Sequence, residues 1–133
     1  MKYKVKVIYP KSFVGQSLMK KIGKEDILPK FSIDLEMNYG DKKEVCEAVF
    51  AEMQHDHPNG SYVEKNDIRC RSMSIGDLVS LKHEDESIYA IVDTIGFKFL
   101  TEKQFNIIAD SQIAWGDRLM GLDWCLKNSI LNI

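Results

Sequence analysis

Long hydrophobic runs, an excess of one charge and closely paired cysteines are all missing from this chain. No segment approaches the roughly 18 apolar residues that a bilayer-spanning helix needs. The net charge of −2 draws the chain as a whole neither to nucleic acid nor to an anionic membrane. Its first residues, MKYKVKVIYP, lack the apolar run of about 7–15 residues typical of a signal peptide. We therefore expect a cytoplasmic protein without a membrane partner.

Metal-binding patterns are also weak. The 3 cysteines, Cys46, Cys70 and Cys125, lie far apart in the sequence, which favours free thiols and excludes the CxxC spacing of a structural zinc site. The segment HDHPNG at 55–60 holds two histidines and an aspartate, but its Pro-Asn-Gly end is typical of a turn. Because a metal site needs three or four converging ligands, we expect no metal and no cofactor.

At 133 residues, with 44% hydrophobic and 29% charged side chains, the chain fits a single domain covering 1–133. Alternation of apolar and polar residues predicts strands near Lys2–Tyr9, Phe31–Tyr39, Leu78–His83 and Ser87–Thr94. Helical spacing and capping residues predict helices near Lys42–Gln54, Thr101–Asp110 and Ile113–Asn128. The fold class expected is α+β: a small, mostly antiparallel sheet with helices packed on one side and a helical C-terminus.

The stretch RCRSMSIGDLVSL, at 69–81, could hold a catalytic serine or only a turn that leads into a strand. A serine nucleophile needs a base within reach and usually a glycine-flanked elbow, and neither Ser72 nor Ser74 has such neighbours. We interpret the stretch as a turn, with Ser74 as a cap, Gly76 at positive φ, and Asp77 bound to backbone N–H groups. No catalytic residue is expected, and we expect no enzyme.

The segment RSMSIGDLVSL, a charged turn and YAIVDTIGFKFL together resemble the YodL-like domain. This is a small bacterial domain, common in mobile and conjugative elements of Gram-positive bacteria and in their phages. The resemblance covers about Lys42–Leu100 and departs from the family pattern at Arg71, Gly76 and Thr94–Ile95. It rests on Ser72, Ser74, Asp77, Tyr89, Val92, Asp93, Gly96 and Phe97. It implies an accessory protein of a mobile element and transfers no site, because the family has no established activity.

The C-terminal segment carries both tryptophans and many apolar residues. It either covers the sheet or forms a partner or dimer surface, for which the candidate protein-binding residues are Trp115, Leu119 and Leu122. On one helix, Trp115 and Trp124 would point in opposite directions unless a glycine breaks it. We expect Trp124 to be buried and Trp115 to be more exposed.

Two functions remain open. The first is a non-enzymatic interaction module of a phage or mobile element, monomeric or homodimeric, that binds a host or mobile-element protein. Inhibition of a host defence system, as by an anti-CRISPR protein, is one form of it. The alternative is a small nucleic-acid-binding accessory or regulatory protein. Its candidate contacts are Lys2, Lys4, Lys6, Arg69 and Arg71. The three lysines have a simpler interpretation, as charges that protect the edge of a sheet.

Overall fold

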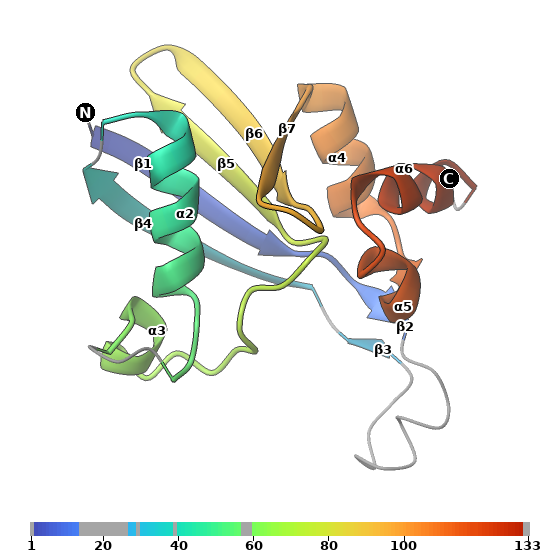
Figure 1. Ribbon diagram of the computed structural model, residues 1–133, viewed down its shortest axis with the longest axis horizontal. Coiled ribbons are helices and arrows are strands. Elements are labelled where there is room, and N and C mark those ends of the chain that lie inside the picture. Colours follow the sequence, from blue (N-terminus) through green and yellow to red (C-terminus); the bar gives the residue numbers. More distant parts are fainter. Residues whose placement is uncertain (1, 14–26, 29, 39, 57–59, 132–133) are drawn as a thin grey trace.

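A five-stranded antiparallel sheet forms the centre of the molecule (Figure 1). The computed structural model describes residues 2–13, 27–28, 30–38, 40–56 and 60–131. The order of the strands across the sheet is β4-β1-β5-β6-β7. They span Lys2–Tyr9 (β1), Phe31–Asn38 (β4), Leu78–His83 (β5), Glu86–Val92 (β6) and Phe97–Leu100 (β7). The four predicted strands are therefore confirmed, and β7 is an addition.

The first strand, β1, lies inside the sheet, where it pairs with both β4 and β5. Its alternation is as predicted, with Tyr3, Val5 and Val7 buried and the lysines between them exposed. Because β1 has a neighbour on each side, its lysines do not protect a sheet edge. The sequence pattern of β1 specified which face of the sheet each side chain points to. The position of β1 inside the sheet follows only from its pairing with β4 and β5.

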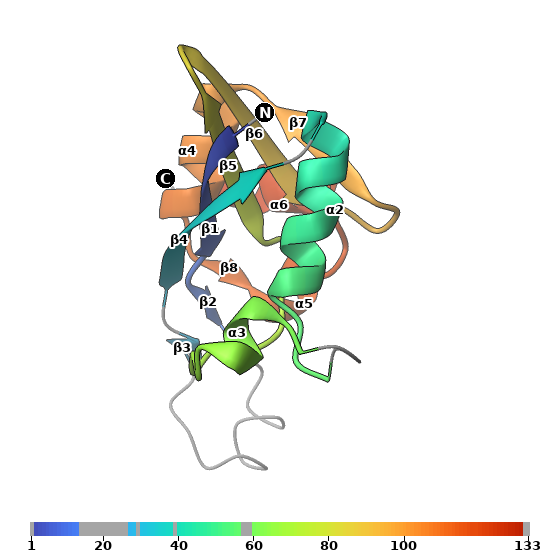
Figure 2. The same cartoon turned by 90° about the vertical axis from the view of Figure 1, so that its left-hand side faces the viewer.

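Helices lie on both faces of the sheet (Figure 2). One face packs on α2 (Lys42–Glu52) and α3 (Tyr62–Lys65), and the other packs on α4 (Glu102–Asp110) and α6 (Leu122–Leu131). Neighbouring strand residues enter different cores: Val79 belongs to the first and Leu78 to the second. The α+β class, the mostly antiparallel sheet and the helical C-terminus are confirmed. The helices, expected on one side, divide between the two faces because β5 is apolar on both.

The C-terminal segment, predicted near Ile113–Asn128 as one helix or a pair of helices, contains two helices preceded by a short strand. It begins with the short strand β8 (Ile113–Ala114), continues as α5 (Trp115–Arg118), and resumes as α6 after Gly121. Gly121 has a φ of 101°, which no right-handed helix contains. The strand β8 pairs in parallel with β2 (Ser12–Phe13), which also pairs with β3 (Ile27–Leu28). This second small sheet depends on pairing between strands that are far apart in the chain, which no local sequence pattern predicts.

Side-chain caps start the helices. As predicted, the Thr101 hydroxyl accepts a hydrogen bond from Gln104 N at 3.1 Å at the start of α4, and Gln104 Oε1 accepts one from Thr101 N at 3.0 Å. Asp41 accepts from Glu44 N at 2.9 Å at the start of α2. The short helix α3, which the periodicity did not predict, begins with a capping box at Ser61.

Candidate functional site

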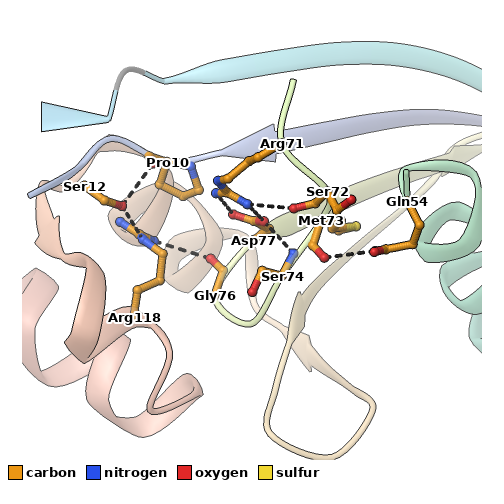
Figure 3. A network of polar contacts seen from close by, with 10 residues as sticks. All are labelled: Pro10, Ser12, Gln54, Arg71, Ser72, Met73, Ser74, Gly76, Asp77 and Arg118. Atoms are coloured by element: carbon orange, nitrogen blue, oxygen red, sulfur yellow. Dashed lines mark hydrogen bonds and ion pairs between the residues drawn. The ribbon is translucent and has the colours of Figure 1, made fainter. Parts of the chain in front are cut away.

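The serine stretch forms a turn organised by Asp77, which is completely buried (Figure 3). Its carboxylate accepts hydrogen bonds from Arg71 Nη1 at 2.5 Å, from Arg71 Nη2 at 2.7 Å and from Ser74 N at 2.8 Å. Asp77, and not Ser74, therefore supplies the capping side chain. Burial raises the pKa of Asp77, and the hydrogen bonds from Arg71 and Ser74 N oppose this rise. Gly76 has a φ of 90°, as predicted.

Ser72 connects this turn to the end of α2. Its hydroxyl accepts a hydrogen bond from the main-chain N of His55 at 2.9 Å, whereas the imidazole Nε2 of His55 lies 2.6 Å from Cys70 O. The hydroxyl and the ring therefore make separate contacts. Gln54 Nε2 adds a further link by donating to Met73 O at 2.9 Å. These contacts attach the strand-leading loop to the helix.

Arg118 is a buried arginine that the sequence analysis missed. Its side chain is completely buried, and it donates from Nε to Ser12 Oγ at 2.7 Å, from Nη1 to Gly76 O at 3.3 Å and from Nη2 to Lys11 O at 3.0 Å. A Cβ on Gly76 would lie 2.0 Å from Arg118 Cγ, so only glycine leaves room for it. In the sequence, Gly76 was the one indication that another side chain packs closely against this turn.

Aromatic rings enclose Arg71 on two sides. Its guanidinium carbon lies 4.1 Å from the ring centroid of Tyr9 and 4.6 Å from that of Trp115. The ring of Phe31 lies 5.1 Å beyond Tyr9, centroid to centroid. Trp115 is half-buried in this stack. It therefore connects the C-terminal segment to the turn.

The other residues of the C-terminal segment differ in exposure. Leu119 and Leu122 are half-buried, and Leu122 packs against the second core. The expectation that Trp124 is buried was wrong: it is 43% exposed, and Cys125 beside it takes the inward position. The helix breaks at Gly121, so the orientation of α6 about its axis does not follow from that of α5. The directions of Trp115 and Trp124 therefore cannot be compared by counting residues along one helix. Met120 is 54% exposed at the same break.

The five basic residues proposed for nucleic acid do not come together. Lys4 and Lys6 of β1 lie opposite Glu36 and Asp34 of β4, and Lys2 Nζ is 3.2 Å from Glu36 Oε2. They project from the face opposite to Tyr9, whose ring Arg71 covers. Arg71 is bound to Asp77, and Arg69 is exposed. The lysine stripe therefore lies on another face of the sheet from Arg71, beside the acidic residues of β4 and Lys82 of β5.

A pocket of about 420 Å³ opens between α2 and the β6–β7 hairpin. Its walls are mostly apolar and come from Phe50, Met73, Ile75, Val92 and Phe97, with Glu47 and Asp93 among the polar residues. The hairpin turn beside it is fixed, because Asp93 Oδ1 accepts from Thr94 N at 2.8 Å and from Leu122 N at 3.1 Å. Ile95, at the turn, is 85% exposed. Sequence analysis did not single out this surface.

Within the described ranges, no group of three or more His, Cys, Asp or Glu side chains could hold a metal ion. Of the histidine pair considered for metal, His57 lies outside the described residues. No helix in the part of the chain that the structure covers is long and apolar enough to cross a bilayer.

A sequence model of the YodL-like domain matches residues 3–103. The chain belongs to the YodL-like domain family. No curated protein and no solved structure matches it. The YodL-like region is thus wider than the resemblance over Lys42–Leu100 indicated, and it includes β1 and β4, which complete the sheet.

The segment after the YodL-like match is joined to it at two positions, Arg71 and Gly76. Trp115 stacks on Arg71, and Arg118 occupies the space left by Gly76. Both contacts bury polar or aromatic groups against the turn that holds Asp77. The C-terminal helices are therefore integrated with the YodL-like core, and Arg71 and Gly76 are the residues that receive them.

Proposed function

We propose that this YodL-like protein is a non-enzymatic interaction module of a phage or mobile element, with a host or mobile-element protein as its partner. Inhibition of a host defence system is one form that this activity would take. The observation that carries the proposal is the apolar pocket between α2 and β7, with Ile95 exposed beside it. Exposed apolar surface next to a shaped pocket is typical of protein-binding sites.

Among the described residues, the large apolar side chains that are exposed come from two parts of the chain. They are Ile95 and Phe99 of the β6–β7 hairpin, and Met120 and Trp124 of the α5–α6 junction. The hairpin and the junction are in contact, since a Cβ on Gly121 would lie 2.3 Å from Asp93 Oδ1. The pocket, with Ile95 exposed beside it, would receive an apolar anchor of a partner.

The state of the reactive groups supports a role without catalysis. Arg71 donates a hydrogen bond to the Asp77 carboxylate, and Arg118 donates to the main-chain oxygens of Gly76 and Lys11. These contacts are typical of a network that stabilises the fold. Burial raises the pKa of Cys46 to about 12 and that of Cys125 to about 11, so neither thiol is an activated nucleophile. These features favour binding over covalent chemistry.

Affinity capture with matched variants tests the proposal. Tagged wild-type protein, Ile95→Asp and Ser87→Asp serve as baits in lysate of a bacterial host of such elements. Ser87 is exposed on β6, outside the apolar pocket, so it controls for the added charge. We expect a host protein that is retained by the wild type and by Ser87→Asp and lost with Ile95→Asp. Retention by all three baits would contradict the role of this surface.

A further inference from the structure

The strand β7 forms one edge of the five-stranded sheet, next to α2 (Figure 2). It pairs only with β6, where Phe97 lies opposite Val92. The main chain of Val92 bonds on its other side: its N–H donates to Asp77 O at 2.9 Å, and its carbonyl accepts from Gly76 N at 2.8 Å. Hydrogen-bonded and non-hydrogen-bonded pairs alternate along an antiparallel pair. The N–H and C=O groups of Phe97 and Phe99 therefore point away from β6, toward the outer edge.

This outer edge of β7 is short and open. Outside the pairing with β6, the described residues provide no hydrogen bond to the main chain of Phe97 or Phe99. The next outward-pointing residue, Thr101, is occupied, because its N–H donates to Gln104 Oε1 and its carbonyl accepts from Phe105 N, both at 3.0 Å. The edge thus presents two donors and two acceptors, the groups that an added strand needs.

The apolar pocket adjoins this edge. Phe97 lines the pocket and packs on the core that faces α2, where its ring centroid lies 6.4 Å from that of Phe50. Residues directly opposite each other in an antiparallel pair have their side chains on the same face of the sheet. A residue bonded to the main chain of Phe97 would therefore direct its side chain to the face that holds the pocket. Main-chain bonds and a side-chain pocket together are typical of sites that bind an extended peptide.

The charges beside the pocket favour a cation on the bound segment. Its lining contains two carboxylates, those of Glu47 and Asp93, and no lysine or arginine. Neither carboxylate forms an ion pair within the part of the chain that the structure describes. At the other end of β7, Lys42 Nζ lies 4.5 Å from the ring centroid of Phe99. A cation of the partner is therefore best placed toward the turn, near Asp93.

We propose that the outer edge of β7 binds an extended segment of the partner protein, which joins the sheet as an antiparallel strand. An apolar side chain opposite Phe97, the anchor, enters the pocket. Because an antiparallel strand runs toward the turn and its alternate residues share a face, a lysine or arginine two residues after the anchor lies near Asp93 and Glu47. This inference rests on the proposed function, since it states in which form the partner binds beside Ile95.

A second copy of this chain does not meet these requirements. If Phe97 of one copy exchanged hydrogen bonds with Phe99 of the other, the two Lys98 side chains would lie directly opposite each other, which is destabilising. The residues two positions after Phe97 and Phe99 are Phe99 and Thr101, so β7 also lacks the cation that the pocket favours. The occupant is therefore a segment of another protein.

Selection from a phage-displayed library of random linear octapeptides, with the full chain as the target, tests the proposal. We expect the enriched sequences to share an apolar residue followed two positions later by lysine or arginine. An enriched octapeptide is then synthesised with blocked ends and a fluorescent label, and anisotropy measures its dissociation constant. A library without enrichment, or enriched sequences without this pattern, would overturn the proposal.

Methylation of the peptide nitrogens separates strand pairing from simple occupation of the pocket. Methyl groups on the anchor and on the residue two positions before it remove the N–H donors that face the carbonyls of Phe97 and Phe99. This peptide should bind at least about fivefold more weakly, the effect of two lost hydrogen bonds. Methyl groups on the two residues beside the anchor point away from β7 and should leave affinity unchanged. Equal affinities of the two methylated peptides would overturn strand addition.

Two matched pairs of protein variants make the test specific. Phe99→Pro and Phe99→Ala both remove the exposed ring, but only proline removes the outward N–H. Phe99→Pro should bind the peptide up to about tenfold more weakly than Phe99→Ala. Glu47→Gln should weaken binding up to about fivefold, whereas Glu86→Gln, which changes an exposed residue outside the pocket, should bind like the wild type. The methylated peptides decide the question if Phe99→Pro does not fold.

The strand proposal and the proposed function can fail separately. A partner that is lost with Ile95→Asp but retained equally by Phe99→Pro and Phe99→Ala would keep the Ile95 surface and overturn strand addition. A partner that all baits retain would contradict the role of that surface, while the two methylated peptides still decide whether β7 accepts a strand. A dimer in gel filtration that Phe99→Pro abolishes would identify a second copy as the occupant and overturn the proposal.

Discussion

Arg71 and Asp77 form a two-point ion pair across the turn that leads into β5, with Nη1–Oδ2 and Nη2–Oδ1 distances of 2.5 and 2.7 Å. The carboxylate is completely buried, and the arginine is partly covered by the rings of Tyr9 and Trp115. Residues from the N-terminal strand, the turn and the C-terminal segment therefore meet at one ion pair. Most of the following predictions concern this contact or the groups around it.

Asp77→Asn should lower the free energy of unfolding by about 2–3 kcal/mol, because it leaves the partly buried Arg71 without its counter-charge. Urea unfolding measures the loss. The double variant Asp77→Asn with Arg71→Met should lose less than the sum of the two single variants, since the pair is coupled. Additive losses would show that the ion pair contributes little.

Gly76→Ala and Gly96→Ala form a matched pair, because both glycines have positive φ, at 90° and 66°. At Gly96 a Cβ meets nothing within 4 Å, so alanine should cost only the backbone strain, about 1 kcal/mol. At Gly76 it would also displace the Arg118 side chain, and the loss should be at least about 2 kcal/mol larger. Thermal and urea unfolding compare the two, and equal losses would contradict the steric role of Arg118.

Ser72→Ala should destabilise the fold by about 1 kcal/mol, because the hydroxyl accepts from His55 N. Ser74→Ala should have a smaller effect, below about 0.5 kcal/mol, because Asp77 binds the main-chain N–H of Ser74 and alanine keeps that group. Both variants should still capture the partner that the wild type captures. Loss of capture by a folded Ser74→Ala protein would show instead that its hydroxyl contacts the partner, since Ser74 lines the apolar pocket.

Stability should fall at alkaline pH because of Cys46 and Cys125. Burial raises their pKa values to about 12 and about 11, above those of exposed thiols. The stability due to these neutral thiols is fully present below the unfolded pKa and is lost as pH rises, since the unfolded chain releases its thiol protons first. The loss approaches about 1.4 kcal/mol per pH unit for each thiol. Urea unfolding between about pH 8 and pH 10 should show a smaller slope in Cys46→Ala; an unchanged slope would contradict the assignment.

The two tryptophans should differ in acrylamide quenching. Trp124 is 43% exposed, whereas Trp115 is half-buried against Arg71. The Trp115→Phe protein, which retains Trp124, should therefore be quenched more strongly than Trp124→Phe. Equal protection of both in a dilute sample would indicate that Trp124 is covered by another copy of the chain.

The comparison of expectation and structure shows which information is local. Alternation placed β1 and β5 at their observed ends, and capping residues placed the starts of α2 and α4, because side-chain direction and helix ends depend on neighbouring residues. The role of Asp77 as a group that pins the turn could also be anticipated. The helix break at Gly121 was visible only as one of two glycines that could interrupt the C-terminal segment.

The sequence by itself therefore determined the α+β class, the inward face of each long strand and the family. Tertiary structure alone decided that β1 lies inside the sheet, that helices cover both faces, and that Arg71 meets Tyr9 and Trp115. It also decided that Ile95 lies exposed beside the apolar pocket. The physical reason is that strand pairing and burial join residues far apart in the chain, and their free energy depends on neighbours that no local pattern specifies.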